Sequence, residues 1–160
     1  MESVIRARMP DPTRRRVEAR TAEGHPVVLD GDPPDGDGSG AGPKEALLAA
    51  LAGCTAMDVA AILAKKRQRP DRYELVVTGT SATAHPRVFT DISVEHRVGG
   101  AVEAEALRRS IELSATRYCP VNAMLRHSVT IEHRYRLEAD GAEPIEAVVV
   151  RIGPGRAVPA

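Results

Sequence analysis

The segment from Lys44 to Gln68, "KEALLAALAGCTAMDVAAILAKKRQ", constrains the fold more than any other part of the chain. It follows Pro43, carries a glutamate in its first turn and ends on basic residues, which is the pattern of a helix bounded at both ends. Apolar residues occur on nearly every side, and the many alanines with Gly53 leave little side chain on its surface. We therefore expect a central helix that close contacts bury on all sides.

The rest of the chain predicts strands and shorter helices around that helix. A hairpin is expected over 13–30, with its turn at Glu23 and Gly24, and the Gly-, Pro- and Asp-rich segment 31–43 predicts a loop. Residues 72–82 and 88–98 flank a turn and predict two paired strands with one wet face. Residues 88–98 and 129–137 alternate between apolar and polar side chains, as such strands do. A helix over 102–118 must end before Pro120, where a short helix begins. The predicted class is α+β.

We expect three parts along the chain: a flexible arm over 1–14, a single domain over 15–138 and a C-terminal tail over 139–160. Within the tail, "IEAVVVRI" fits one more strand. A chain of this length can bury a real core without a second domain.

Composition argues against several classes of partner. The chain has 22 Lys and Arg against 22 Asp and Glu, and only 2% of its residues are aromatic, so neither a basic field nor base-stacking platforms favour nucleic acid. The N-terminus lacks the apolar run of a signal peptide, and we find no run of about 18 uncharged apolar residues that would span a membrane. We expect a cytoplasmic protein.

The chain has two cysteines, far apart in sequence, at Cys54 and Cys119. With Pro120 opening a helix, Cys119 takes the N-cap position, where unpaired N–H groups favour a thiolate. In a reducing compartment the two thiols are buried spectators, metal ligands or redox groups. Of the histidines, none has ligand spacing to either cysteine, so we expect no metal; they are His25, His85, His96, His127 and His133.

Asp58 follows Cys54 by four residues and shares its helix face, with Thr55 beside it. A carboxylate at this position raises the pKa of the thiol unless a cation intervenes. Alternatively, Asp58 pairs with an arginine or a hydroxyl elsewhere.

The segments "GPKEALLAALAGCTAMDVAAIL", "IELSATRYCPVNAML" and "VTIEHRYRL" together resemble the OsmC/Ohr family of organic hydroperoxide reductases, over roughly residues 17–138. The resemblance implies an α+β fold in which two chains form an intertwined homodimer, with two long central helices packed against antiparallel sheets. It also implies that Cys54 is the peroxidatic thiol and Cys119 the resolving thiol. The reaction would need no cofactor, only an organic hydroperoxide and an external dithiol reductant.

Family members also use an arginine that lowers the pKa of the thiolate and a glutamate that holds this arginine. The resemblance points to Arg20 for the first and Glu45 for the second, although the family acid usually comes directly after the proline, where this chain has Lys44. That shift moves Glu45 about 100° around the helix. A non-catalytic protein that binds a small apolar ligand at the dimer interface is therefore the alternative function.

Overall fold

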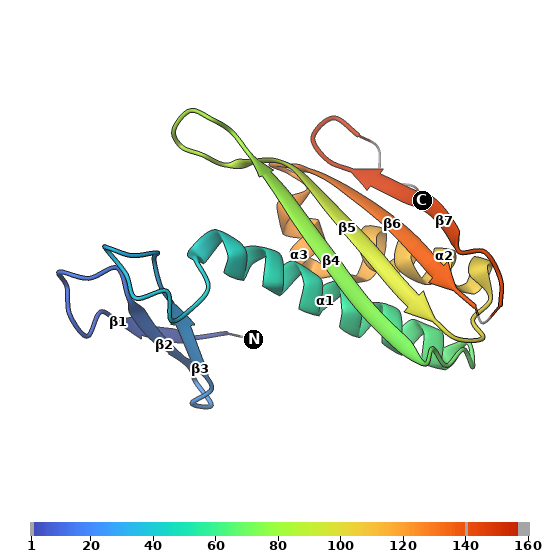
Figure 1. Ribbon diagram of the computed structural model, residues 1–160, viewed down its shortest axis with the longest axis horizontal. Coiled ribbons are helices and arrows are strands. Elements are labelled where there is room, and N and C mark those ends of the chain that lie inside the picture. Colours follow the sequence, from blue (N-terminus) through green and yellow to red (C-terminus); the bar gives the residue numbers. More distant parts are fainter. Residues whose placement is uncertain (1, 140, 157–160) are drawn as a thin grey trace. The chain divides into compact units, whose positions relative to one another are not determined.

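The computed structural model of the protein describes residues 2–139 and 141–156 (Figure 1). By its internal contacts the chain divides into two units, residues 1–47 (unit 1) and 48–160 (unit 2). Unit 1 contains a three-stranded sheet, and unit 2 contains a four-stranded sheet with helices. The predicted α+β class is confirmed.

Unit 1 is built on strands β1 (Ile5–Arg8), β2 (Val17–Thr21) and β3 (Pro26–Leu29), which are antiparallel in that order. The predicted hairpin is β2 and β3, and Gly24 in its turn has a φ of 90°, which favours glycine. The expectation that 1–14 is only a flexible arm needs correction, because it contains β1. All four side chains of β1 are exposed, so no buried face marks this strand in the sequence.

The predicted loop after β3 is organised by one buried carboxylate, that of Asp30. Its oxygens accept hydrogen bonds from the Ser39 hydroxyl at 2.7 Å and from the backbone N–H groups of Ser39, Gly31 and Asp37. These bonds, that of the Ser39 hydroxyl first, lower the pKa of Asp30 to about 2. The carboxylate thus fixes the loop that precedes helix α1 (Pro43–Lys65).

The sheet of unit 2 has the order β4 (Arg72–Ser81), β5 (Phe89–Gly99), β6 (Thr130–Glu138) and β7 (Ile145–Ile152). Strands β5 and β6 are parallel, and the other pairs are antiparallel. The parallel pair departs from a purely antiparallel sheet because a long crossover containing α2 (Ala104–Leu113) and α3 (Pro120–Leu125) joins β5 to β6. The segment "IEAVVVRI" of the expected tail is confirmed as a strand, β7.

The core of unit 2 lies between this sheet and the helices on one of its faces (Figure 1). The alternation predicted for the strands is confirmed, since Ile92, Val94, His96 and Val98 of β5 are buried. Leu51 of α1 packs into one apolar cluster with β5, β6 and β7. Farther along α1, Val59 and Leu63 pack into a second cluster with α2.

Helix α1 is buried along one stripe only, formed by Leu51, Thr55, Val59 and Leu63. The expectation that it is buried on every side is not met within the single chain, and Met57 is 75% exposed. Among the described residues, α1 is long and apolar enough to cross a membrane by length and composition alone, a criterion that core helices also meet.

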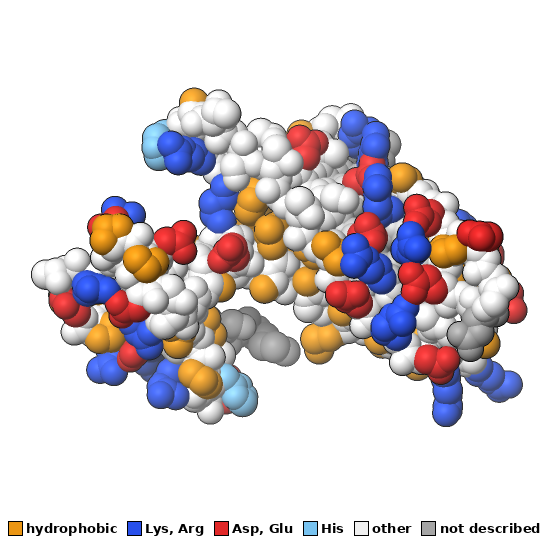
Figure 2. All heavy atoms as spheres, in the orientation of Figure 1, with side chains coloured by type: hydrophobic (Ala, Val, Ile, Leu, Met, Phe, Trp, Pro, Cys, Tyr) orange, Lys and Arg blue, Asp and Glu red, His pale blue; other side chains and the backbone are white. Residues whose placement is uncertain are grey.

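The outer face of the unit 2 sheet carries acidic and basic side chains side by side (Figure 2). Ion pairs join neighbouring strands across it, including Arg151 with Glu132 and Arg136 with Glu146. Charges of both signs alternate over this surface, so it has no extended field of one sign.

Candidate active site

Cys54 and Cys119 meet in the interior of unit 2. Cys54 lies in the middle of α1, and Cys119 lies between the π-helical turn Ser114–Tyr118 (η1) and α3. Both are free thiols, and their Sγ atoms are 2.8 Å apart. A disulfide bond is about 2.05 Å long, so a short movement of either side chain would bring the sulfurs to bonding distance.

The backbone around Cys119 explains how its thiol is aimed. Its N–H donates to the Ser114 carbonyl oxygen at 3.0 Å, which closes the π-helical turn. Pro120 then begins α3, and Cys119 is the N-cap residue of that helix, as predicted. The Asn122 backbone N–H donates to Cys119 Sγ at 3.4 Å. The π turn and the proline together place this thiol over α1.

Asp58 lies beside the two thiols. Its Oδ2 accepts a hydrogen bond from the Ser114 hydroxyl at 3.2 Å, which confirms the alternative that Asp58 pairs with a hydroxyl. Burial raises the pKa of the Cys54 thiol, and the contact with Cys119 and the Asp58 charge raise it further. The Val121 backbone N–H acts in the opposite direction. Within unit 2, Cys54 is therefore held as a neutral thiol at pH 7.

The ligand atoms of Cys54, Asp58 and Cys119 all lie within 4.8 Å of one another, which brings together three groups that can bind a metal ion. Two thiolates on a tetrahedral zinc ion, however, are about 3.8 Å apart. The 2.8 Å between these sulfurs is therefore closer to the geometry of disulfide formation than to that of a metal site.

A set of buried polar side chains leads away from Cys119. The Thr55 hydroxyl donates to Cys119 Sγ at 3.8 Å, and Asn122 Nδ2 donates to Thr55 Oγ1 at 3.2 Å. Asn122 Oδ1 in turn is 3.0 Å from His133 Nε2.

Two histidines extend this set across the sheet. His133 Nδ1 is 3.4 Å from His96 Nε2, and His96 Nδ1 is 2.8 Å from the Tyr73 hydroxyl. Sequence reasoning weighed these histidines only as zinc partners. The signal that could have found them is their position, since both occupy inward-facing positions of their strands. We call the six linked side chains the hydrogen-bond chain: Cys119, Thr55, Asn122, His133, His96 and Tyr73.

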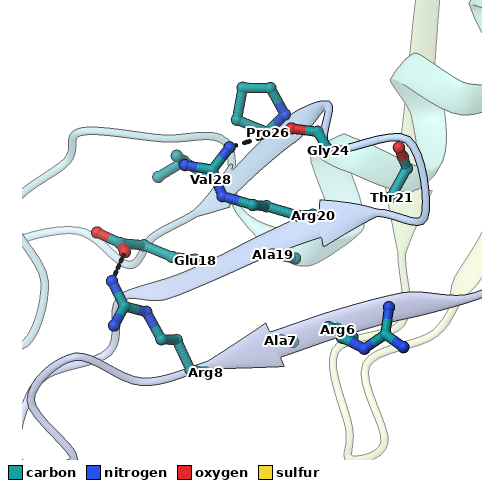
Figure 3. Close-up of a pocket in the computed structure, with 10 residues that line it drawn as sticks. All are labelled: Arg6, Ala7, Arg8, Glu18, Ala19, Arg20, Thr21, Gly24, Pro26 and Val28. Carbon is teal, nitrogen blue, oxygen red and sulfur yellow. Dashed lines mark hydrogen bonds and ion pairs between the residues drawn. The ribbon is translucent and has the colours of Figure 1, made fainter.

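Arg20 lies in unit 1, on β2, and lines a cavity of about 530 Å³ (Figure 3). Arg6, Arg8 and Glu18 line the same cavity, and Arg8 forms an ion pair with Glu18 at 3.0 Å. The Arg20 guanidinium donates to the Gly24 carbonyl oxygen at 3.0 Å. The role of Arg20 as activator of Cys54 stays a prediction.

Glu45 stands in the first turn of α1, and its carboxylate accepts the Gly42 backbone N–H at 2.8 Å. This is the bond that a glutamate three residues after the N-cap usually makes, so it caps the helix. Glu45 and Arg20 thus each bond to backbone near their own place in the chain. Pairing of Glu45 with an arginine stays a prediction as well.

Comparison with known proteins places this geometry in a family. Residues 36–134 match the family model described as OsmC-like protein. The chain belongs to the OsmC-like family. It is 38% identical over 120 residues to protein YhfA of Escherichia coli, a match that covers 74% of this chain and 87% of the relative.

Solved structures of OsmC-like proteins share the fold. An OsmC-like protein from Mycoplasma pneumoniae superposes with a TM-score of 0.74 at 20% identity, over 86% of this chain and 97% of the other. An organic hydroperoxide resistance protein OsmC from Legionella pneumophila superposes with a TM-score of 0.61 at 17% identity, over 86% and 97%. The family model and YhfA thus confirm the family to which the sequence pointed, and these structures confirm the fold.

Proposed function

We propose that this OsmC-like protein is a thiol-dependent peroxidase that reduces organic hydroperoxides to alcohols. The observation that carries the proposal is the 2.8 Å separation of Cys54 Sγ and Cys119 Sγ. The name of the Legionella relative, an organic hydroperoxide resistance protein, supports the same class of substrate.

In the proposed cycle the Cys54 thiolate attacks the distal peroxide oxygen, the O–O bond breaks and an alcohol leaves with a proton. Cys54 is then a sulfenic acid. The Cys119 sulfur attacks the Cys54 sulfur, water leaves, and a disulfide forms. A dithiol reductant restores both thiols and is itself oxidised to a disulfide. The reaction needs no other cofactor.

Accessibility supports this order of the two thiols. Cys54 is half-buried, whereas Cys119 is only 2% exposed. A hydroperoxide therefore reaches Cys54 more easily.

A homodimer is part of the proposal. Helix α1 buries one stripe and leaves much of its apolar surface uncovered, and Met124 of α3 is 66% exposed. Apolar surface of this kind in a water-soluble chain is usually an interaction site. Members of the family form dimers, and a second copy of this chain is the occupant that we propose for this surface.

The test is consumption of cumene hydroperoxide and of hydrogen peroxide by the purified protein with dithiothreitol, beside Cys54→Ser. We expect rapid loss of the organic peroxide that the variant abolishes, and slower loss of hydrogen peroxide. Turnover equal to that of the variant would overturn the proposal.

The second candidate is a non-catalytic protein that binds a small apolar ligand. Asp58 favours it, because the carboxylate raises the pKa of Cys54 and so opposes formation of the reactive thiolate. Binding of a fluorescent apolar probe without peroxidase activity, unchanged in Cys119→Ser, would favour the binder.

A further inference from the structure

The hydrogen-bond chain is made of polar groups that the fold removes from water. Thr55, His96, Asn122 and His133 all have 0% exposure. Burial of a polar group is unfavourable unless the group forms a hydrogen bond, and here each group bonds to its neighbour in the hydrogen-bond chain. The arrangement links strands β4, β5 and β6 to the buried thiol of Cys119, which lies over α1.

The protonation states of the two histidines follow from their burial. Burial lowers the pKa of His133 to about 4, and burial together with the neighbouring His133 lowers the pKa of His96 well below its usual value. Both rings are therefore neutral at pH 7, and each has one N–H group and one ring nitrogen that can accept.

The N–H groups of the two rings point the same way along the hydrogen-bond chain. Asn122 Oδ1 can only accept, so the hydrogen of His133 is on Nε2, and its Nδ1 must accept from His96 Nε2. His96 Nδ1 then accepts from the Tyr73 hydroxyl. The donors of Tyr73, His96 and His133 are therefore each directed along the hydrogen-bond chain toward Asn122.

At the other end, two donors converge on sulfur. With Oδ1 held by His133, the amide of Asn122 is oriented so that Nδ2 donates to Thr55 Oγ1. The one hydroxyl hydrogen of Thr55 is then free to donate to Cys119 Sγ, which also accepts from the Asn122 backbone N–H. Two hydrogen bonds to one sulfur favour its negatively charged form.

We propose that the hydrogen-bond chain positions Asn122 and Thr55 so that they stabilise the thiolate of Cys119. His133 and His96 are positioning residues, because they act on the sulfur through Asn122. This inference rests on the proposed function, in which Cys119 is the resolving thiol, and it assigns that thiol a second task in the recycling step.

In recycling, a thiolate of the dithiol reductant attacks Cys54 Sγ. A bond forms between the reductant and Cys54, the Cys54–Cys119 bond breaks, and the electron pair leaves on Cys119. The second thiol of the reductant then breaks the mixed disulfide and releases Cys54. Cys119 leaves faster when its thiolate is stabilised, and Cys54 is the more accessible of the two sulfurs. Both effects therefore favour attack of the reductant on Cys54.

The test uses the full chain with Cys54→Ser, in which Cys119 is the only cysteine, since the protein has 2. The rate of alkylation by iodoacetamide at pH 7 measures how readily Cys119 reacts as a thiolate. Adding His133→Phe should lower this rate about tenfold, the effect of weakening one hydrogen bond to a charged group. His133→Gln, whose amide nitrogen can still donate to Asn122, should restore most of the rate. Asp58 also faces Cys119 from α1, and it is left unchanged in all of these variants.

A matched control separates positioning from general loss of structure. Ser110→Ala removes another fully buried hydroxyl, one that donates within its own helix to the Ala106 carbonyl oxygen at 2.7 Å. It should leave the alkylation rate of Cys119 unchanged. If His133→Phe does not fold, Thr55→Val beside Thr55→Ser makes the same comparison at the sulfur itself, with Thr55→Val lowering the alkylation rate of Cys119 and Thr55→Ser preserving it.

A second measurement finds the leaving sulfur. The wild-type disulfide, formed with diamide, is treated briefly with glutathione, quenched and mapped by mass spectrometry. Glutathione on Cys54 is expected, and glutathione on Cys119 would overturn the inference. An unchanged alkylation rate of Cys119 in both His133→Phe and Thr55→Val, or an equal fall of this rate in Ser110→Ala, would overturn it too. None of these readouts requires peroxidase activity, so they can succeed or fail independently of the proposed function.

Discussion

The sulfur atoms of Cys54 and Cys119 lie 2.8 Å apart although 65 positions separate the two residues in the chain. One sulfur comes from the middle of α1 and the other from the N-cap of α3. Because η1 ends at Tyr118, directly before Cys119, and Pro120 starts a new helix, the backbone turns the second thiol toward the first. The fold therefore holds both thiols ready to form a disulfide.

Removing the second thiol should stop the cycle after its first chemical step. In Cys119→Ser, one equivalent of cumene hydroperoxide is expected to leave a lasting sulfenic acid on Cys54, since no thiol remains at 2.8 Å to condense with it. Dimedone labelling followed by mass spectrometry detects that species. Cys54→Ser is the control and should take no label, while a labelled Cys54→Ser would contradict the assignment of the peroxidatic thiol.

Neutralising Asp58 should speed the reaction at neutral pH. The carboxylate contributes to the raised pKa of Cys54, so Asp58→Asn lowers this pKa and increases the thiolate fraction. A charge removed within 4.8 Å predicts an increase of about threefold to tenfold in the single-turnover rate at pH 7. Asp91→Asn, an exposed acid on β5, is the matched control. A slower Asp58→Asn would show that the carboxylate assists the chemistry.

Stability should fall in mild acid because of the buried histidines. Burial holds the pKa of His133 at about 4 in the folded state, below its unfolded value of about 6.5. Between these values the unfolded chain binds more protons, so the free energy of unfolding decreases as the pH falls through this window. The loss from His133 approaches about 3 kcal/mol near pH 4.

Urea unfolding at pH 7 and at pH 4.5 measures this effect. His133→Gln, which cannot titrate there, should lose about 2 to 3 kcal/mol less than wild type over the same interval. The exposed His127→Gln is the control and should follow wild type. Equal pH dependence in all three proteins would mean that His133 is not buried in its neutral form.

The oligomeric state should depend on the uncovered face of α1. Met57 is 75% exposed, and a charge at this position would be buried without a partner in a dimer that covers α1. Met57→Glu is therefore expected to shift the protein from dimer to monomer in light scattering coupled to gel filtration. Val88→Glu, at a 57% exposed apolar position next to β5, should remain dimeric. A wild-type monomer at micromolar concentration would contradict the proposed dimer.

Much of the fold of unit 2 could be predicted because its strands have one wet face. In β6 the buried positions Ile131, His133, Tyr135 and Leu137 follow the period of two seen in the sequence. The N-cap position of Cys119 was also predictable, since Pro120 cannot continue the preceding helix. Strand β1 was not, because its side chains are all exposed and only its pairing with β2 defines it.

The candidate site was predictable only in part. Both thiols were found from their motifs, but the links from Cys119 through Asn122 and His133 to His96 depend on how distant segments meet. The alternation of apolar and polar residues predicts that each histidine lies on the inward face of its strand, but it does not predict that the two rings are in contact. The parallel pairing of β5 with β6 sets that contact, and it arises from the crossover between them.

The most direct test of the central claim is the intact mass of the wild-type protein after one equivalent of cumene hydroperoxide, with peptide mapping and measurement of the alcohol formed. The account predicts one cumyl alcohol per chain, the loss of two hydrogen atoms and a disulfide between Cys54 and Cys119 of the same chain. Unreacted peroxide with both thiols still free would contradict it.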